Sequence, residues 1–174
     1  MTEHLIHEST HFTTRQASDT RVPGHLIVAS RVACTSLDGF TEDVTGSFDW
    51  SEPDEDLHKM YNDLMHGVGV QLLGRRMYET MAVWETDPSF FEESEVLSDF
   101  AAAWQDSDKV VYSTSLTDVS TARTTIERTF EPEAVRRLKE TSASDLSIGG
   151  AGIAAEAFRH GLVDECVLLL CPVL

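Results

Sequence analysis

The glycine-rich segment at residues 145–161 has the residue types of a phosphate-binding turn. It reads as a short apolar strand, a turn at Gly149-Gly150, and a helix that ends at Gly161. A helix that starts directly after such a turn offers unbonded backbone N–H groups and the positive end of its dipole to an anion. Glycine matters here because a side chain would hold the backbone away from the ligand. The same turn is equally compatible with plain packing, so a phosphate site requires support from elsewhere in the chain.

Two further segments supply that support. Arg75 and Arg76 follow a strand-like segment that ends at Gly74, and a guanidinium group matches phosphate with a planar fork of donors. Residues 113–115 close another strand with three hydroxyl groups. Three such junctions fit a dinucleotide with a pyrophosphate and a third phosphate, which describes NADPH better than NADH. Taken singly, the arginines would only offset nearby carboxylates and the hydroxyls would only cap a turn.

The composition excludes some classes of partner. The chain carries 30 acidic and 13 basic residues, a formal net charge of −17, whereas nucleic acid and anionic membranes are bound by basic faces. It has no run of about eighteen apolar residues and no apolar block near its N-terminus, so we expect a cytoplasmic protein without a transmembrane helix. The acidic surface suits both a high-salt cytoplasm and an ordinary one.

The order of the predicted elements indicates a single α/β domain over residues 23–174, preceded by a flexible tail at residues 1–22. We expect strands at 25–35, 68–73, 109–114, 124–128, 146–148 and 163–173, with helices at 53–66, 77–84, 92–105, 132–140 and after Gly150. This alternation predicts a mostly parallel sheet, with ligands bound where strands end and helices begin. The segment 163–173 is apolar on both faces and is predicted to be a central strand with neighbours on both sides.

Five collinear motifs resemble the dihydrofolate reductase-like family, in the branch that contains the riboflavin-biosynthesis reductase (RibD C-terminal) domain. They are SLDGF at residues 36–40, LLGRRMYE at 72–79, VVYSTS at 110–115, IGGAG at 148–152, and GLVDE at 161–165 with CPVL at 171–174. Together they span about 140 residues, and their order is far more specific than any one of them. The resemblance implies an NADPH-dependent reductase fold, with a central, mostly parallel sheet flanked by helices.

In such enzymes the Gly-Arg junction and the hydroxyl-rich strand end hold the adenosine phosphates, and the Gly-Gly turn holds the pyrophosphate near the nicotinamide. The loop that carries residues 38–39 lies beside the nicotinamide and can act as a lid. The residues that the resemblance implies in cofactor binding are Gly39, Gly74, Arg75, Arg76, Ser113, Thr114, Gly149, Gly150, Ala151 and Ile153.

The substrate side of the resemblance rests on Trp50 and the acidic start of the following helix. In folate reductases a Trp precedes a helix-borne carboxylate that binds the pteridine and assists proton delivery. Asp56 resembles that carboxylate best, although this chain has one residue more than the family between the Trp and the carboxylate. The alternative is that Asp54, Glu55 and Asp56 form a solvated first helical turn. Asp38 likewise has two alternative roles, as a turn residue or as a substrate contact.

Two departures from the family pattern accompany the resemblance. The chain lacks the His-x-Glu and Pro-Cys-x-x-Cys signature of the zinc deaminase in bifunctional riboflavin enzymes, and no metal site is expected. Relatives continue past the equivalent of residues 172–174 into a final antiparallel hairpin, which is missing from this sequence. An uncovered sheet edge would put activity in doubt more than fold.

These observations predict an oxidoreductase that transfers hydride from NADPH to a small heterocycle, pterin-like or pyrimidine-like. It would be comparable to dihydrofolate reductase or to 5-amino-6-(5-phosphoribosylamino)uracil reductase. The expected partners are the small-molecule substrate and a second copy in a homodimer. A non-catalytic nucleotide-binding protein of the same fold is the competing hypothesis, and an interaction module without a ligand is the third. Cofactor-dependent reduction of a substrate separates the first hypothesis from the second.

Overall fold

The computed structural model describes residues 12–13, 26–29, 35–38, 40–47, 53–92 and 94–171. Its main strands are β2 (Leu26–Ala29), β3 (Val68–Gly74), β4 (Asp108–Tyr112), β5 (Thr124–Glu127), β6 (Asp145–Gly149) and β7 (Glu165–Val167). These six strands form one sheet in the order β5-β4-β3-β6-β2-β7, and each neighbouring pair is parallel. The predicted α/β class with a parallel sheet is confirmed.

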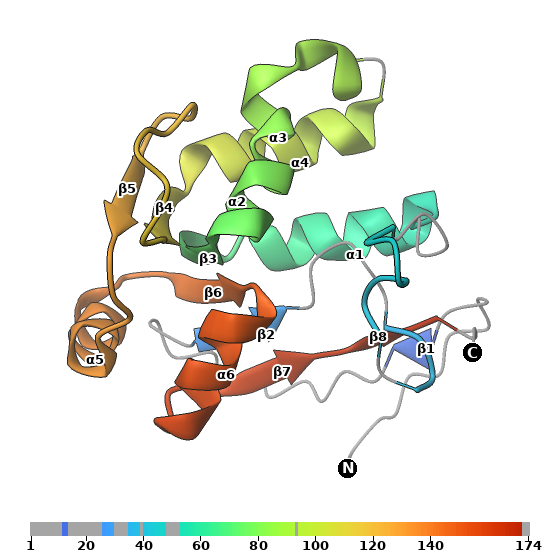
Figure 1. The fold of residues 1–174 in the computed structure, drawn as a ribbon. Coiled ribbons are helices and arrows are strands. Elements are labelled where there is room, and N and C mark those ends of the chain that lie inside the picture. Colours follow the sequence, from blue (N-terminus) through green and yellow to red (C-terminus); the bar gives the residue numbers. More distant parts are fainter. Residues whose placement is uncertain are drawn as a thin grey trace.

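The helices alternate with the strands along the chain, as the sequence predicts. They are α1 (Glu55–Met65), α2 (Arg75–Met81), α3 (Val83–Thr86), the 3-10 turn η2 (Pro88–Phe90), α4 (Glu95–Asp106), α5 (Pro132–Thr141) and α6 (Ala151–Arg159). Figure 1 shows α1 to α4 on one side of the sheet and α5 with α6 on the other. In the described part of the chain, no helix has the length and apolar character needed to cross a membrane.

The two faces of the sheet are packed by alternate residues of β3, because successive side chains of a strand point to opposite faces. Leu73 belongs to the cluster on the α2–α4 side, together with Trp104 and Val111. Leu72 belongs to the opposite cluster, which it shares with Leu146 and with Ala157 of α6. Both leucines are almost fully buried, and each such burial contributes about 1.5–3 kcal/mol. The two clusters fix β3 at the centre of a three-layer structure.

The segment predicted as a long central strand at residues 163–173 is divided, so that prediction is wrong. Strand β7 lies at one end of the strand order and pairs with β2 alone among the described strands. After residue 168 the chain continues as β8 (Leu169–Leu170), which pairs antiparallel with β1 (Phe12–Thr13). The apolar character of this segment has a different cause, because Leu169 and Cys171 pack against Leu57 and Tyr61 of α1. The flexible tail predicted at residues 1–22 is described only at β1 and stays a prediction.

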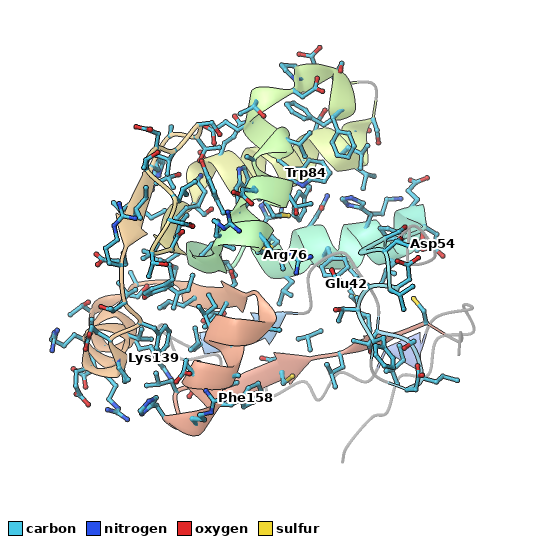
Figure 2. All side chains as sticks on the ribbon, viewed as in Figure 1. Glu42, Asp54, Arg76, Trp84, Lys139 and Phe158 are labelled. Carbon is cyan, nitrogen blue, oxygen red and sulfur yellow. The ribbon has the colours of Figure 1, made fainter. Side chains whose placement is uncertain are left out.

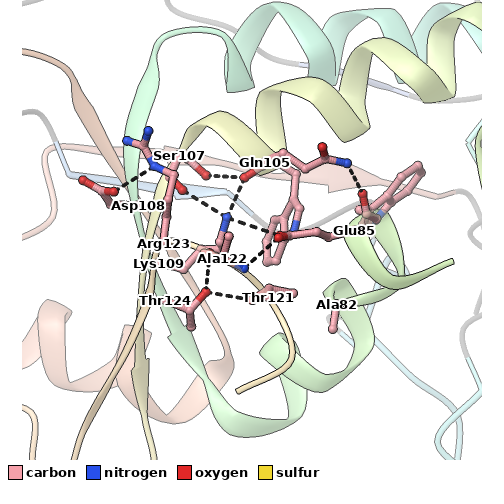
Figure 3. Close-up of polar contacts among 12 residues, drawn as sticks. Ala82, Glu85, Gln105, Ser107, Asp108, Lys109, Thr121, Ala122, Arg123 and Thr124 are labelled. Carbon is pink, nitrogen blue, oxygen red and sulfur yellow. Dashed lines mark hydrogen bonds and ion pairs between the residues drawn. The ribbon is translucent and has the colours of Figure 1, made fainter. Parts of the chain in front are cut away.

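Lys109, at the start of β4, has its side chain buried in the protein (Figure 3). Its ammonium group donates to the carbonyl oxygens of Trp104 and Ser107 at 2.9 and 3.0 Å, and lies 3.8 Å from a carboxylate oxygen of Glu85. The other oxygen of Glu85 accepts from the Ala122 backbone N–H at 2.6 Å. Burial lowers the pKa of the Lys109 ammonium, and the Glu85 carboxylate opposes that shift in part. This network joins α3, α4 and β4 at the amino end of the strand.

Replacing Lys109 with Met should lower the free energy of unfolding by about 3 kcal/mol, because it leaves the Glu85 carboxylate without its counter-ion and two carbonyl groups without their donor. Adding Glu85→Gln should recover part of that loss. Lys59→Met is the matched control, since Lys59 pairs with Glu55 on an exposed helix face and should change stability by less than about 1 kcal/mol. Urea unfolding of the variants measures these differences. Equal stability of Lys109→Met and the native chain would contradict the account.

The pH dependence of stability should carry the signature of the same lysine. The pKa of Lys109 is lower in the folded protein than its ordinary value of 10.5. At pH values between the folded-state pKa and 10.5, unfolding therefore takes up a proton. The free energy of unfolding therefore rises with pH through that window. The difference in stability between the native chain and Lys109→Met should grow as the pH approaches 10.5, and a difference that shrinks would show the opposite linkage.

Candidate functional site

The three junctions that the sequence predicts as phosphate contacts meet at one edge of the sheet. β3 lies between β4 and β6, and all three run parallel. Leu73 pairs with Gly149 in β6, and Gly74 pairs with Tyr112 in β4. The carboxyl ends of these strands therefore lie side by side, where open α/β sheets bind their ligands.

The backbones of Gly74 and Gly150 approach each other closely at this edge. Gly150 precedes α6 with φ 108°, a conformation that favours glycine. A Cβ atom at position 150 would lie 3.3 Å from the nitrogen and 3.4 Å from the Cα of Gly74. The positive φ and this tight contact thus favour glycine at 150 for the fold itself. A Gly150→Val variant would disturb folding as well as any ligand contact, so it cannot separate the two roles.

Helix α6 begins without a capping side chain. Asp54 and Ser94 cap α1 and α4 by accepting from backbone N–H groups three residues ahead, whereas Gly150 offers no such group. The first turn closes only where the Ala154 N–H reaches the Gly150 carbonyl at 3.0 Å. The N–H groups of the three preceding residues, 151–153, lie at a helix start that lacks a side-chain acceptor. Such donors suit an anion.

The residues of this first turn differ in exposure. Ala151 and Gly152 are exposed, and a Cβ atom added at Gly152 would meet nothing within 4 Å. Ile153 is half-buried and packs against the core cluster beneath the sheet. A ligand at this turn would therefore meet the backbone of residues 151–153, with open space beside Gly152.

Arg75 and Arg76 begin α2, directly after Gly74, and each has a carboxylate partner. Arg75 lies 3.7 Å from Glu79 on the same helix, and Arg76 lies 3.4 Å from Glu42 of the loop after Thr35. Figure 2 shows Arg76 and Glu42 pointing toward one another. The side chains of Arg75 and Arg76 remain 48% and 75% exposed. Both guanidinium groups are accessible to a ligand even though each is offset by a carboxylate.

At the hydroxyl-rich end of β4, one hydroxyl group is already engaged in hydrogen bonds within the turn that follows the strand. The Ser113 hydroxyl oxygen accepts from the backbone N–H groups of Ser115 and Leu116 at 3.3 and 2.9 Å. Arg128, which the sequence analysis did not identify, donates to the carbonyl oxygens of Ser113 and Leu116 at 2.9 and 2.7 Å. Ser113 is buried in this turn, whereas Thr114 is exposed. Thr114 is therefore better placed than Ser113 to meet a ligand.

Tyr112 precedes this turn, next to Gly74 in the sheet. Its ring packs against Phe130, with ring centroids 5.2 Å apart. Burial, with a smaller contribution from the Glu127 carboxylate, raises the pKa of Tyr112 to about 12. The phenol, protonated at neutral pH like any tyrosine, therefore stays protonated to more alkaline pH than an ordinary tyrosine.

Two of the residues predicted for catalysis, Asp38 and Asp56, lie on the surface of the described part of the chain. Asp38 is exposed and accepts from the Ser36 hydroxyl at 2.6 Å. Asp56 is exposed in the first turn of α1, more than one helical turn before the part of α1 that approaches the edge. Trp50, and the cofactor candidate Gly39, lie outside the described residues. Their roles stay predictions.

A small, mainly apolar cavity of about 40 Å³ lies beneath Gly149. Its lining comes from α1, β3, α2, α4 and β6: Tyr61, Met65, Gln71, Leu73, Met77, Met81, Phe100, Ser147, Ile148 and Gly149. A Cβ atom at Gly149 would come within 3.1 Å of the Met77 side chain. The absence of a side chain at 149 thus makes room for Met77. The sequence analysis assigned no role in a site to the methionines or to Tyr61.

A second hollow, of about 1000 Å³, lies between α1 and the first residues of α4. It is bordered by carboxylates, including Asp54, Glu55 and Asp99, with Lys59 among them. Asp56 does not line either this groove or the cavity beneath Gly149. Within the described ranges, no three His, Cys, Asp or Glu side chains are grouped to hold a metal ion.

Solved structures similar to this chain include two from riboflavin biosynthesis. A protein of Shewanella sp. PV-4 assigned to riboflavin biosynthesis aligns with a TM-score of 0.62 and 19% identity, over 88% of this chain and 78% of its own. A diaminohydroxyphosphoribosylaminopyrimidine deaminase/5-amino-6-(5-phosphoribosylamino)uracil reductase of Thermotoga maritima aligns with a TM-score of 0.47 and 16% identity, over 79% of this chain and 42% of its own. Comparison with curated proteins gives no match. Residues 31–174 match the RibD C-terminal domain, and the chain therefore belongs to that family.

Proposed function

We propose that this chain is an NADPH-dependent reductase that transfers hydride to a small heterocycle, pterin-like or pyrimidine-like. Membership of the RibD C-terminal domain family supports a reductase-like role. The observation that carries the proposal is the contact between Gly74 and Gly150, which sets the uncapped start of α6 beside the two arginines of α2. Backbone donors and guanidinium groups at one sheet edge suit a ligand with several phosphates.

The phosphate groups divide between two sets of donors in this proposal. The N–H groups of residues 151–153 bind the pyrophosphate, because they begin a nine-residue helix with no side-chain cap. Arg75 and Arg76 bind the additional phosphate that distinguishes NADPH from NADH. Thr114, exposed at the end of the neighbouring strand, adds a hydroxyl donor.

The cofactor supplies the hydride, and the protein binds, orients and shields the reactants. The cavity beneath Gly149 adjoins the phosphate edge and is walled in part by Met65, Met77 and Met81. Methionine side chains are flexible and polarizable, and they adapt to ligands of different shape. We place the reacting ring of the substrate against this wall.

Nucleotide binding without turnover is the second candidate, and one observation favours it. The described residues that line the cavity beneath Gly149 include no Asp, Glu or His side chain. Asp56, the predicted proton donor, is exposed elsewhere on α1. A reductase of this mechanism needs a source of protons at the ring, so turnover must be tested separately from binding.

NADPH should bind about ten- to a hundredfold more tightly than NADH at low salt, because a charge-assisted hydrogen bond to the extra phosphate is worth roughly 1.5–3 kcal/mol. Isothermal titration of both cofactors measures the difference. Oxidation of NADPH, followed at a fixed protein concentration with panels of pterins and pyrimidines, then tests turnover. Equal affinity for the two cofactors would remove the proposed role of the arginines. Tight binding without oxidation would leave the non-catalytic alternative.

Gly152→Asp should abolish dinucleotide binding without loss of stability. An added side chain at 152 meets open space, and a carboxylate in the first turn of α6 is favourable for the helix dipole but repels a pyrophosphate. Gly152→Ala is the matched control, because it fills the same position without a charge and should keep binding. Thermal unfolding and titration with NADPH measure the two properties. If the Asp variant is stable and binds NADPH as tightly as the Ala variant, the pyrophosphate does not lie at this helix.

A further inference from the structure

The loop at residues 36–47 is built from two turns that close on themselves. In the first, the Ser36 hydroxyl oxygen accepts from the Phe40 N–H at 2.9 Å, and the Ser36 N–H donates to the Phe40 carbonyl at 2.8 Å. In the second, the Asp43 carboxylate accepts from the N–H groups of Thr45 and Ser47 at 2.7 and 3.0 Å. These hydrogen bonds lower the pKa of Asp43, with that from the Thr45 side chain contributing most. Each of these hydrogen bonds joins two residues of the same turn.

Glu42 lies between these turns and reaches out of the loop to Arg76 of α2. One terminal nitrogen of Arg76 lies 3.5 and 3.4 Å from the two carboxylate oxygens of Glu42. Phe40 and Val44, on either side of Glu42, are largely exposed, at 63% and 105%. These two apolar side chains therefore do not anchor this part of the loop to the rest of the protein by packing. The Glu42–Arg76 ion pair is its described link to the start of α2.

A carboxylate and a phosphate present similar oxygens to a guanidinium group. We infer that Glu42 engages, in the free protein, one terminal nitrogen of Arg76 whose donors the additional phosphate of NADPH takes on binding. Glu42 thus lowers the affinity for NADPH relative to NADH, and cofactor binding releases the loop from α2. This inference rests on the proposed function, because it takes Arg76 as a phosphate ligand.

The effect expected from Glu42 is modest. Its side chain and that of Arg76 are 45% and 75% exposed, and exposed ion pairs are weak and screened by salt. Glu42→Gln should therefore tighten NADPH binding about two- to fivefold at low ionic strength, and the gain should fall as salt is added. Binding of NADH, which lacks the additional phosphate, should stay the same within about a factor of 1.5.

Isothermal titration of the native chain and of Glu42→Gln with NADPH and NADH tests this inference. Glu133→Gln is the control, because it removes the same charge from an exposed ion pair with Arg136 on α5, which takes no part in the proposed site. Hydrogen exchange at residues 40–47 gives a second readout that does not depend on affinity. Exchange in the free protein should be faster in Glu42→Gln than in the native chain, and NADPH should abolish that difference.

The outcomes separate the two proposals. If NADPH binds the native chain and Glu42→Gln with equal affinity, and the loop exchanges equally in both free forms, Glu42 does not compete for Arg76. A Glu133→Gln variant that gains as much affinity would assign the effect to net charge and also overturn the inference. If neither NADPH nor NADH binds the native chain, the proposed function itself fails and this inference falls with it.

Discussion

The contact between the backbones of Gly74 and Gly150 is the constraint on which the rest of the candidate site depends. Gly150 adopts a positive φ and lies so close to the backbone of Gly74 that a side chain at position 150 would crowd it. This approach sets the first turn of α6 beside Arg75 and Arg76, although about 75 residues separate them in sequence. The two leucine-centred clusters on either face of β3 hold the strands that make the contact. The core thus stabilises an arrangement that leaves backbone donors unused at its edge.

Electrostatics at this edge differ from those of the chain as a whole. A protein with a net charge of −17 repels anions over most of its surface, and long-range attraction cannot bring a dinucleotide to it. Affinity must come from short-range donors. Arg75 and Arg76 provide them, but Glu79 and Glu42 already neutralise part of their charge. Binding a polyphosphate here is an exchange of partners at each arginine, so its strength depends on which carboxylates can be displaced.

The sequence predicted the parallel sheet, the helices and the meeting of the three junctions, because glycine turns and hydrophobic alternation are local signals. It could not predict that the backbone of Gly74 crowds position 150, since that contact is between segments far apart in the chain. Ser113 illustrates the same limit: its residue type suggested a phosphate contact, but Arg128 and the turn after β4 engage it. The segment at 163–173 looked central because it is apolar on both faces, whereas Leu169 and Cys171 within it are covered by α1. Long-range packing decided each of these cases.

The central claim is that the ligand phosphates lie between the starts of α2 and α6. The most direct measurement is a titration of isotope-labelled protein with NADP⁺, followed by the shifts of backbone amide resonances. The account predicts the largest changes at residues 74–76 and 151–153, with smaller changes at Thr114 and across residues 40–47. Changes centred instead on the first turns of α1 and α4, which border the large groove between those helices, would contradict it.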